Sequence, residues 1–171
     1  SNTNLKDDKG QVISILSIGK DITDRKRVQQ KIMETQDRYR LFLESVPMHV
    51  GVIDESGKFI IWNKYSEEML GYTKQEVLGK MPPRYLHDSE QEAREVIEIA
   101  TREGIFDREL NLIHRNGSRV PVRLVVVPIK DKDKITGFYG FAEDISRRRK
   151  TESELLITKE KLESIALKDS L

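Results

Sequence analysis

The chain has 171 residues, which is enough for one domain of ordinary size together with connecting elements. It contains 30 Lys and Arg against 29 Asp and Glu, and this balance gives no bulk attraction to nucleic acid or to an anionic membrane surface. The absence of cysteine excludes a disulfide framework, a thiolate metal site and a cysteine nucleophile.

No apolar run approaches the roughly 20 residues that a membrane-spanning helix needs, and the N-terminal residues do not form a signal-peptide pattern. We therefore expect a cytoplasmic segment without membrane contact. The charged fraction of 35% is high for one compact domain, and it favours long solvated helices beside a globular part.

An internal repeat organises the chain. A β-branched stretch at residues 12–19 leads into Asp21-Ile22-Thr23, and an aromatic stretch leads into Asp144-Ile145-Ser146, with a basic run after each tripeptide. The offset from Asp21 to Asp144 is 123 residues, which is the length of a domain rather than of a solenoid unit. We interpret residues 1–23 as the last strand of a preceding domain of the same kind. The alternative is a chance similarity of two strands.

Residues 24–46 have the pattern of a linker helix. Their apolar side chains recur at spacings of four and three residues, and Pro47 ends the pattern. This spacing is typical of a two-stranded coiled coil, although an amphipathic helix that packs on its own domain has the same pattern. The positions, called the N-terminal seam below, are Val28, Ile32, Thr35, Tyr39, Phe42 and Val46.

Residues 47–146 read as a globular domain that starts with a hairpin and short helices. Strands at 49–54 and 58–62 flank a turn. Asn63 is expected to cap a helix that Gly71 ends in the left-handed conformation. A brief helical turn is expected at 73–78, and a capping box of Asp88 and Gln91 predicts the start of a longer helix.

Three strands follow these helices. Strands at 106–114 and 119–129 flank Asn116-Gly117, the strongest short hairpin signal, and a loop at 130–134 leads into the final strand. Two strands, several helices and then three strands indicate an α+β domain with helices on one face of an antiparallel sheet.

The sequence of this predicted globular domain resembles the PAS family. The stretches that carry the resemblance are Ile60–Asn63, Glu68–Gly79, Asn116–Ser118 and Gly137–Ser146, within residues 41–146. The resemblance implies a five-stranded antiparallel sheet of order 2-1-5-4-3 with helices that enclose a pocket against one face. It also implies a homodimeric sensor that transmits a signal through helices at its two ends.

The resemblance assigns signal transmission to Asp144, Ile145 and Ser146. In the family, the aspartate at the end of the last strand ties that strand to the exit helix, and Ser146 would cap the helix. The alternative is that both side chains merely satisfy free N–H groups of the helix. The following Arg147-Arg148-Arg149 places positive charge at the positive end of the helix dipole, and acidic groups on a neighbouring chain are one hypothesis for their partners.

No cofactor is predicted. Flavin-binding light sensors of this family need a reactive cysteine, and haem sensors place a histidine on the long helix, where residues 88–103 have none. Trp62 could line a pocket for a non-covalent flavin, but tryptophan at a strand end more often packs in the core. The three histidines have no metal-ligand spacing, and neither a catalytic nor a metal site is predicted.

A small organic ligand is the preferred hypothesis, with a filled, ligand-free core as the alternative. Arg84 or Arg123 would meet a carboxylate of such a ligand. The other candidate pocket residues are Trp62, Leu110, Leu112, Val122, Leu124 and Phe138.

Residues 147–171 read as an exit helix that leads to a truncated output domain. Leu155, Thr158, Leu162 and Ile165 form a short C-terminal seam. The stretch 166–171 resembles the opening of GGDEF diguanylate cyclase domains, which implies a parent protein that makes cyclic di-GMP. The alternatives are a histidine kinase, whose acceptor histidine would lie after Leu171, or a module that only dimerises.

Overall fold

The computed structural model describes residues 2–17 and 23–168, and the chain divides into two compact units, Ser1–Leu41 and Phe42–Leu171. In the first unit, β1 (Asn2–Lys6) and β2 (Val12–Ser17) pair as an antiparallel hairpin. An Asp7 carboxylate oxygen accepts from the backbone N–H groups of Lys9 at 3.0 Å and Gln11 at 2.9 Å, which stabilises the turn. The expected Asp21-Ile22 element lies outside the described residues.

Helix α1 (Thr23–Ser45) begins and ends within one residue of the expected linker helix. In the N-terminal seam, Val28, Ile32, Tyr39 and Phe42 are between 53% and 61% exposed. The seam therefore offers open apolar surface along the helix.

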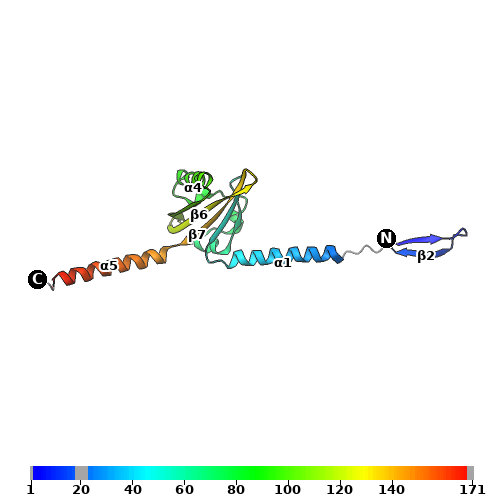
Figure 1. Cartoon of the computed structure of the whole chain (residues 1–171), viewed down its shortest axis with the longest axis horizontal. Coiled ribbons are helices and arrows are strands. Elements are labelled where there is room, and N and C mark those ends of the chain that lie inside the picture. Colours follow the sequence, from blue (N-terminus) through cyan, green and yellow to red (C-terminus); the bar gives the residue numbers. More distant parts are fainter. Residues whose placement is uncertain (1, 18–22, 169–171) are drawn as a thin grey trace. The chain divides into compact units, whose positions relative to one another are not determined.

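The second unit is built on one five-stranded antiparallel sheet of order β4-β3-β7-β6-β5. Counted along this unit, the order is 2-1-5-4-3, as the resemblance to the PAS family implies. Figure 1 shows α4 beside this sheet. The strands are β3 (His49–Asp54), β4 (Phe59–Trp62), β5 (Phe106–Ile113), β6 (Arg119–Asp131) and β7 (Lys134–Asp144).

Short helices follow β4, and their ends are set by local side chains. Helix α2 (Lys64–Leu70) has Asn63 as its N-cap and ends at Gly71, whose φ of 76° is left-handed. Helix α3 (Lys74–Val77) begins with a capping box in which the Glu76 carboxylate accepts from the Thr73 N–H at 2.9 Å. The two ends of α2 confirm the sequence prediction, whereas the capping box of α3 was not predicted; the 3-10 helix η1 (Pro83–Leu86) follows.

The predicted start of α4 (Glu90–Glu103) is wrong by one residue. The Ser89 hydroxyl, rather than Asp88, accepts from the Glu92 N–H at 3.1 Å, and the Glu92 carboxylate accepts from the Asp88 N–H at 3.1 Å. The sequence Ser89-x-x-Glu92 also matches the capping-box pattern and was overlooked, although here the Glu92 carboxylate reaches the N–H of Asp88 rather than that of the N-cap Ser89. Gly104, with φ of 81°, ends the helix.

The predicted loop at 130–134 is mostly strand. Strands β6 and β7 pair as far as Asp131 and Lys134, so only Lys132 and Asp133 form the turn. Lys132 has a φ of 54°, a left-handed conformation that glycine or asparagine usually takes, and the missing glycine explains why the tight turn was not predicted.

The core lies between the helices and the face of the sheet that they cover, called the inner face below. Alternation along β6 places Val122, Leu124 and Val126 there, all at most 6% exposed. Trp62, Leu70 and Val77 fill the space below the short helices, and each such buried side chain contributes roughly 1.5–3 kcal/mol. Helix α5 (Ser146–Lys168) leaves directly from the end of β7.

Candidate functional site

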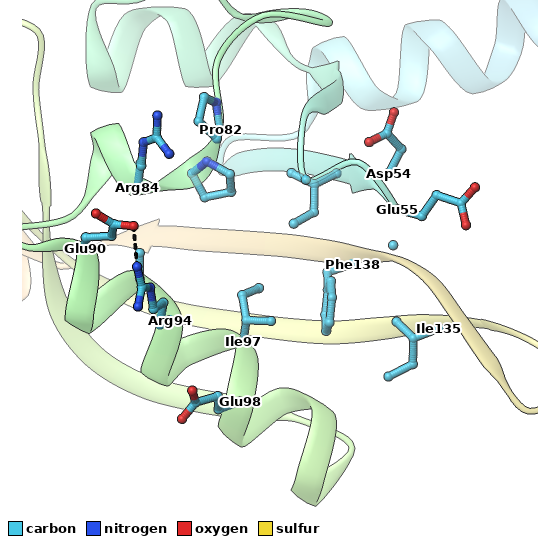
Figure 2. Close-up of a pocket in the computed structure, with 15 residues that line it drawn as sticks. Asp54, Glu55, Pro82, Arg84, Glu90, Arg94, Ile97, Glu98, Ile135 and Phe138 are labelled. Atoms are coloured by element: carbon cyan, nitrogen blue, oxygen red, sulfur yellow. Dashed lines mark hydrogen bonds and ion pairs between the residues drawn. The ribbon is translucent and has the colours of Figure 1, made fainter.

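A groove of about 510 Å³ lies between the β3–β4 turn, η1, α4 and β7. Ile97 of α4 and Ile135 and Phe138 of β7 form its apolar middle, and Figure 2 shows Ile97 beside Phe138. Pockets for small ligands are mostly apolar, hold a few polar groups and measure roughly 300–1,000 Å³. The groove therefore has the size and lining of a ligand site.

Charged side chains form the rim of this groove. The Arg94 Nη2 donates to Glu90 Oε1 at 2.6 Å, so these two charges satisfy each other (Figure 2). The Arg84 guanidinium instead lies 5.2 Å from the ring centre of Tyr85, whose hydroxyl raises the pKa of Arg84, as the more distant Glu90 does to a smaller extent, and within the described residues Arg84 forms no salt bridge with a carboxylate. Arg84 is thus a rim cation with hydrogen-bond donors left for an anionic group.

A second, interior cavity lies deeper between α4 and the inner face. Its volume is about 50 Å³, and His49, Leu112, Leu124 and Phe138 are among the residues that line it. This space holds no more than a few water molecules. A ligand of drug size therefore finds room in the outer groove, not in the interior cavity.

The structure brings only some of the predicted pocket residues together. Phe138 lies in both spaces, Arg84 lies at the groove, and Leu112 and Leu124 line the interior cavity. Val122 is fully buried in the core and lines neither space.

The remaining predicted pocket residues lie elsewhere. Leu110 is half-buried and borders a hollow between α4 and β5. Trp62 is 2% exposed, packs edge-on against His49 and Phe59 and donates from Nε1 to the Tyr72 carbonyl at 3.0 Å, as a core tryptophan does. Arg123 lies on the outer face of the sheet.

The groove residues that sequence reasoning missed come from η1 and α4. Ile97 and Ala93 of α4, and Pro82 and Pro83 at the start of η1, line the groove and were not among the predicted pocket residues. Ile97 offered a signal for the groove. A large apolar side chain at the edge of the apolar stripe of a helix is only partly covered by the core, so the rest of it can line an open groove.

A buried polar cluster joins the inner core to the end of α1. His49 Nδ1 lies 2.7 Å from Ser66 Oγ, and Ser66 Oγ contacts Asn63 Oδ1. Asn63 Nδ2 donates to the carbonyls of Leu43 at 3.0 Å and Met48 at 2.9 Å. One amide therefore caps α2 and holds the last turn of α1, and burial lowers the pKa of His49 to about 4.

Asp144 and Ile145 fix the start of α5. The Asp144 carboxylate accepts from the Ser146 N–H at 2.8 Å, and Ile145, which is 1% exposed, donates from its N–H to the Pro121 carbonyl at 3.0 Å. The accepting side chain at this helix end is that of Asp144, whereas Ser146 is the first helical residue. The expectation that Ser146 caps the helix is therefore wrong, whereas Asp144 does connect the end of β7 to the first turn of α5.

The family profile described as "PAS fold" matches residues 37–145, which is more than half of the chain. The chain belongs to the PAS family. A PAS domain from Colwellia psychrerythraea has a similar structure, with a TM-score of 0.59 and 28% identity, and the match covers 68% of this chain and 98% of that one.

Two curated relatives connect this PAS domain with signalling proteins. "Probable diguanylate cyclase DgcE" of Escherichia coli K12 is 24% identical over 147 residues, 83% of this chain and 13% of its own length. "Two-component system protein A" of Emericella nidulans is 25% identical over 122 residues, 68% of this chain and 18% of its own. The chain thus spans less than a fifth of either relative.

Two other features, a metal site and a membrane-spanning helix, were considered for the described residues. No group of three His, Asp or Glu side chains within residues 2–17 and 23–168 lies close enough to hold a metal ion. Within the same residues, no helix combines the length and apolarity of a membrane span.

Proposed function

We propose that this chain is the cytoplasmic sensory segment of a signalling protein, and that its PAS domain binds a small apolar molecule with a carboxylate. The observation that carries the proposal is the 510 Å³ groove with an apolar middle and, at its rim, the Arg84 guanidinium, which forms no salt bridge with a carboxylate of the described residues. Binding is expected to move η1 and α4, whose side chains line the groove, against the sheet.

The signal would leave through α5 to an output domain in the same parent protein. Support comes from the direct Asp144–Ser146 junction and from the similarity to a relative named as a diguanylate cyclase. A GGDEF output is therefore preferred. The similarity to a two-component protein favours a histidine kinase as the second candidate, and the parent's residues after Leu171 distinguish the two.

A ligand-free dimerisation module is a third candidate, because side chains nearly fill the interior of the domain and leave a cavity of only about 50 Å³. In that case, the groove would be only a surface depression. We propose homodimerisation through the PAS domain and the flanking helices in either case, whether or not the domain binds a ligand.

Octanoate and octanol test the groove, since they share an eight-carbon chain and differ in charge. We expect octanoate to bind about tenfold more tightly than octanol, because one charge-assisted hydrogen bond from Arg84 contributes roughly 1.5 kcal/mol. Isothermal titration measures both affinities, and Arg84→Gln should remove the difference. Arg102→Gln, which changes an arginine paired with its neighbour Glu103, is the control. Equal affinities in the unchanged chain would contradict the role of Arg84, and no binding of either probe would favour the ligand-free module.

A further inference from the structure

A row of charged side chains crosses the outer face of the sheet, the face opposite the core. The register pairs Glu109 of β5 with Arg123 of β6, and Arg123 with Glu143 of β7. Arg123 also donates from Nε and Nη2 to the two carboxylate oxygens of Asp107 at 2.8 and 2.7 Å. Opposite charges therefore alternate across the three strands that lie nearest to the start of α5.

Glu109 continues this row into the exit helix. Arg149 Nη2 donates to Glu109 Oε2 at 3.0 Å, and Arg148 Nη2 donates to Glu109 Oε1. The hydrogen bond from Arg149 lowers the pKa of Glu109, so the carboxylate is ionised at neutral pH. The partner of the basic run is thus a glutamate of the same chain, and its negative charge opposes the unfavourable charge at the helix start.

Two consecutive residues of α5 contact one carboxylate, and together these contacts limit the direction that the helix takes. Neighbouring side chains point about 100° apart around a helix axis, and Arg148 and Arg149 each reach a different oxygen of the Glu109 carboxylate. Ile145, buried just before the helix, fixes the position of its first turn. The buried residue fixes where α5 begins, and Glu109 fixes the direction in which it leaves.

Glu109 also lies next to an element that lines the groove. It borders a hollow of about 150 Å³ together with Glu92, Glu95 and Val96 of α4. Phe106 of β5 and Val96 of α4 are both buried in the same core, at 4% and 3% exposure. A shift of α4 is therefore passed to β5 through packed side chains rather than through solvent.

We propose that Glu109 is a positioning residue for signal output, which couples the α4–β5 side of the domain to the direction of α5. This inference rests on the proposed function in one respect, that α5 carries the signal. Glu109, Arg148 and Arg149 are each between 43% and 47% exposed, and exposed ion pairs are weak individually. The anchor is consequently easy to release, as a switch requires.

Because the chain has no cysteine, two introduced cysteines can each carry a spin label. The distance between the two labels then reports the direction of α5 relative to the sheet. Ser153→Cys on α5 and Lys130→Cys at the far end of β6 are both exposed positions. Labelled protein is diluted with unlabelled protein, so that only distances within one chain are recorded. We expect a narrow distance distribution in the otherwise unchanged chain, and a distribution at least about twofold broader with Glu109→Gln, because the weak pairs that restrict the helix are lost.

Matched variants separate positioning from general stability. Glu103→Gln removes a carboxylate that pairs with Arg102 at the end of α4, and it should leave the distribution unchanged. Arg148→Gln combined with Arg149→Gln should broaden it as Glu109→Gln does, and adding Glu109→Gln to that pair should change nothing further. Glu109→Asp, which keeps the charge on a shorter side chain, should give an intermediate width.

Identical distributions for the unchanged chain and Glu109→Gln would overturn the proposal, as would equal broadening by Glu103→Gln. This measurement needs neither a ligand nor an output domain. A failure of octanoate to bind therefore leaves the anchoring role intact, whereas a failure of Glu109→Gln to broaden the distribution leaves the ligand site intact.

Discussion

His49 is a titratable side chain without contact to bulk water. It is 3% exposed, its Nδ1 lies 2.7 Å from the Ser66 hydroxyl, and its ring meets Trp62 edge-on at 5.0 Å. Burial disfavours the imidazolium and lowers the pKa of His49 from 6.5 to about 4. The ring therefore stays neutral in the folded domain and titrates near its ordinary value only after unfolding.

This difference predicts acid sensitivity. Between about pH 6.5 and pH 4 the unfolded chain binds a proton at His49 that the folded chain does not, so the free energy of unfolding decreases as the pH falls through that window. The total loss is about 3 kcal/mol for a shift of this size. Urea unfolding from pH 7 to pH 4.5 measures it, and His49→Gln, although less stable at pH 7, should lose less stability on acidification.

His87 provides the comparison for this experiment. Burial also lowers the pKa of His87, despite the nearby Glu92 carboxylate, so His87→Gln should reduce the acid-dependent loss as well. If His49→Gln keeps the full pH dependence of the unchanged chain, the neutral buried state of His49 is wrong.

At the scale of residues, the sequence predicted roles that depend on local chemistry. Asn63 and Gly71 were assigned as the two ends of α2, because capping and left-handed conformations have strong local preferences. Arg123 was placed at the pocket although Val122 and Leu124 beside it point to the core, and the strict alternation of a strand already excludes it. The second role of Asn63, on the carbonyls of Leu43 and Met48, depends on tertiary placement and has no local signal.

At the scale of elements, the pairing of β3 with β7 depends on a close approach of two backbones. Gly137 pairs with Asp54, and a Cβ atom at Gly137 would lie 2.2 Å from the Ile53 carbonyl oxygen. Backbone atoms cannot move aside as a flexible side chain can. Gly140, three residues along the same strand and therefore on its other face, leaves 3.5 Å to the nearest atom, the Gly51 carbonyl oxygen.

We expect Gly137→Ala to destabilise the domain by about 2 kcal/mol or more, because the clash forces the β3–β7 ladder apart. Urea unfolding gives the stability, and amide exchange at residues 53 and 54 shows whether the pairing opens there. Gly140→Ala is the matched control and should be nearly neutral. Equal stability of the two variants would contradict the close approach at Gly137.

The elements themselves were predictable where turns have strong signals. Asn116-Gly117 and the Glu55–Gly57 turn located two hairpins, and the sheet order then came from the family resemblance. Strand β1 was missed because its sequence, Asn-Thr-Asn-Leu-Lys, has neither β-branched runs nor clean alternation. The groove could not be predicted, since it depends on how far α4 stands from the β3–β4 turn.

At the scale of the whole molecule, the exposed apolar surface of the two long helices predicts self-association. Leu155 and Leu162 of the C-terminal seam are 69% and 62% exposed, much as Val28 and Ile32 are in the N-terminal seam. Pairing of two chains would remove this surface from water, and each buried large side chain contributes roughly 1.5–3 kcal/mol.

We therefore expect a dimer in sedimentation equilibrium. Ile32→Glu should raise its dissociation constant by at least about tenfold, because it places a charge in the paired seam. Met33→Glu changes a neighbouring apolar residue outside the seam that is somewhat more exposed, and it should have a much smaller effect. A chain that stays monomeric at high micromolar concentration would contradict pairing through these helices.

The amide of Asn63 has a consequence for the chemical ageing of the protein. Its nitrogen supplies the donors for the carbonyls of Leu43 and Met48, while its oxygen serves the capping contacts of α2. Hydrolysis of asparagine to aspartate exchanges that nitrogen for a charged oxygen, which would repel both carbonyls and leave the α2 contacts in place. Replacement of one atom type thus removes both contacts that Asn63 makes with the end of α1 and the segment after it, and Glu44, which accepts from the Lys64 N–H at 2.8 Å, remains as a link between the last turn of α1 and the domain.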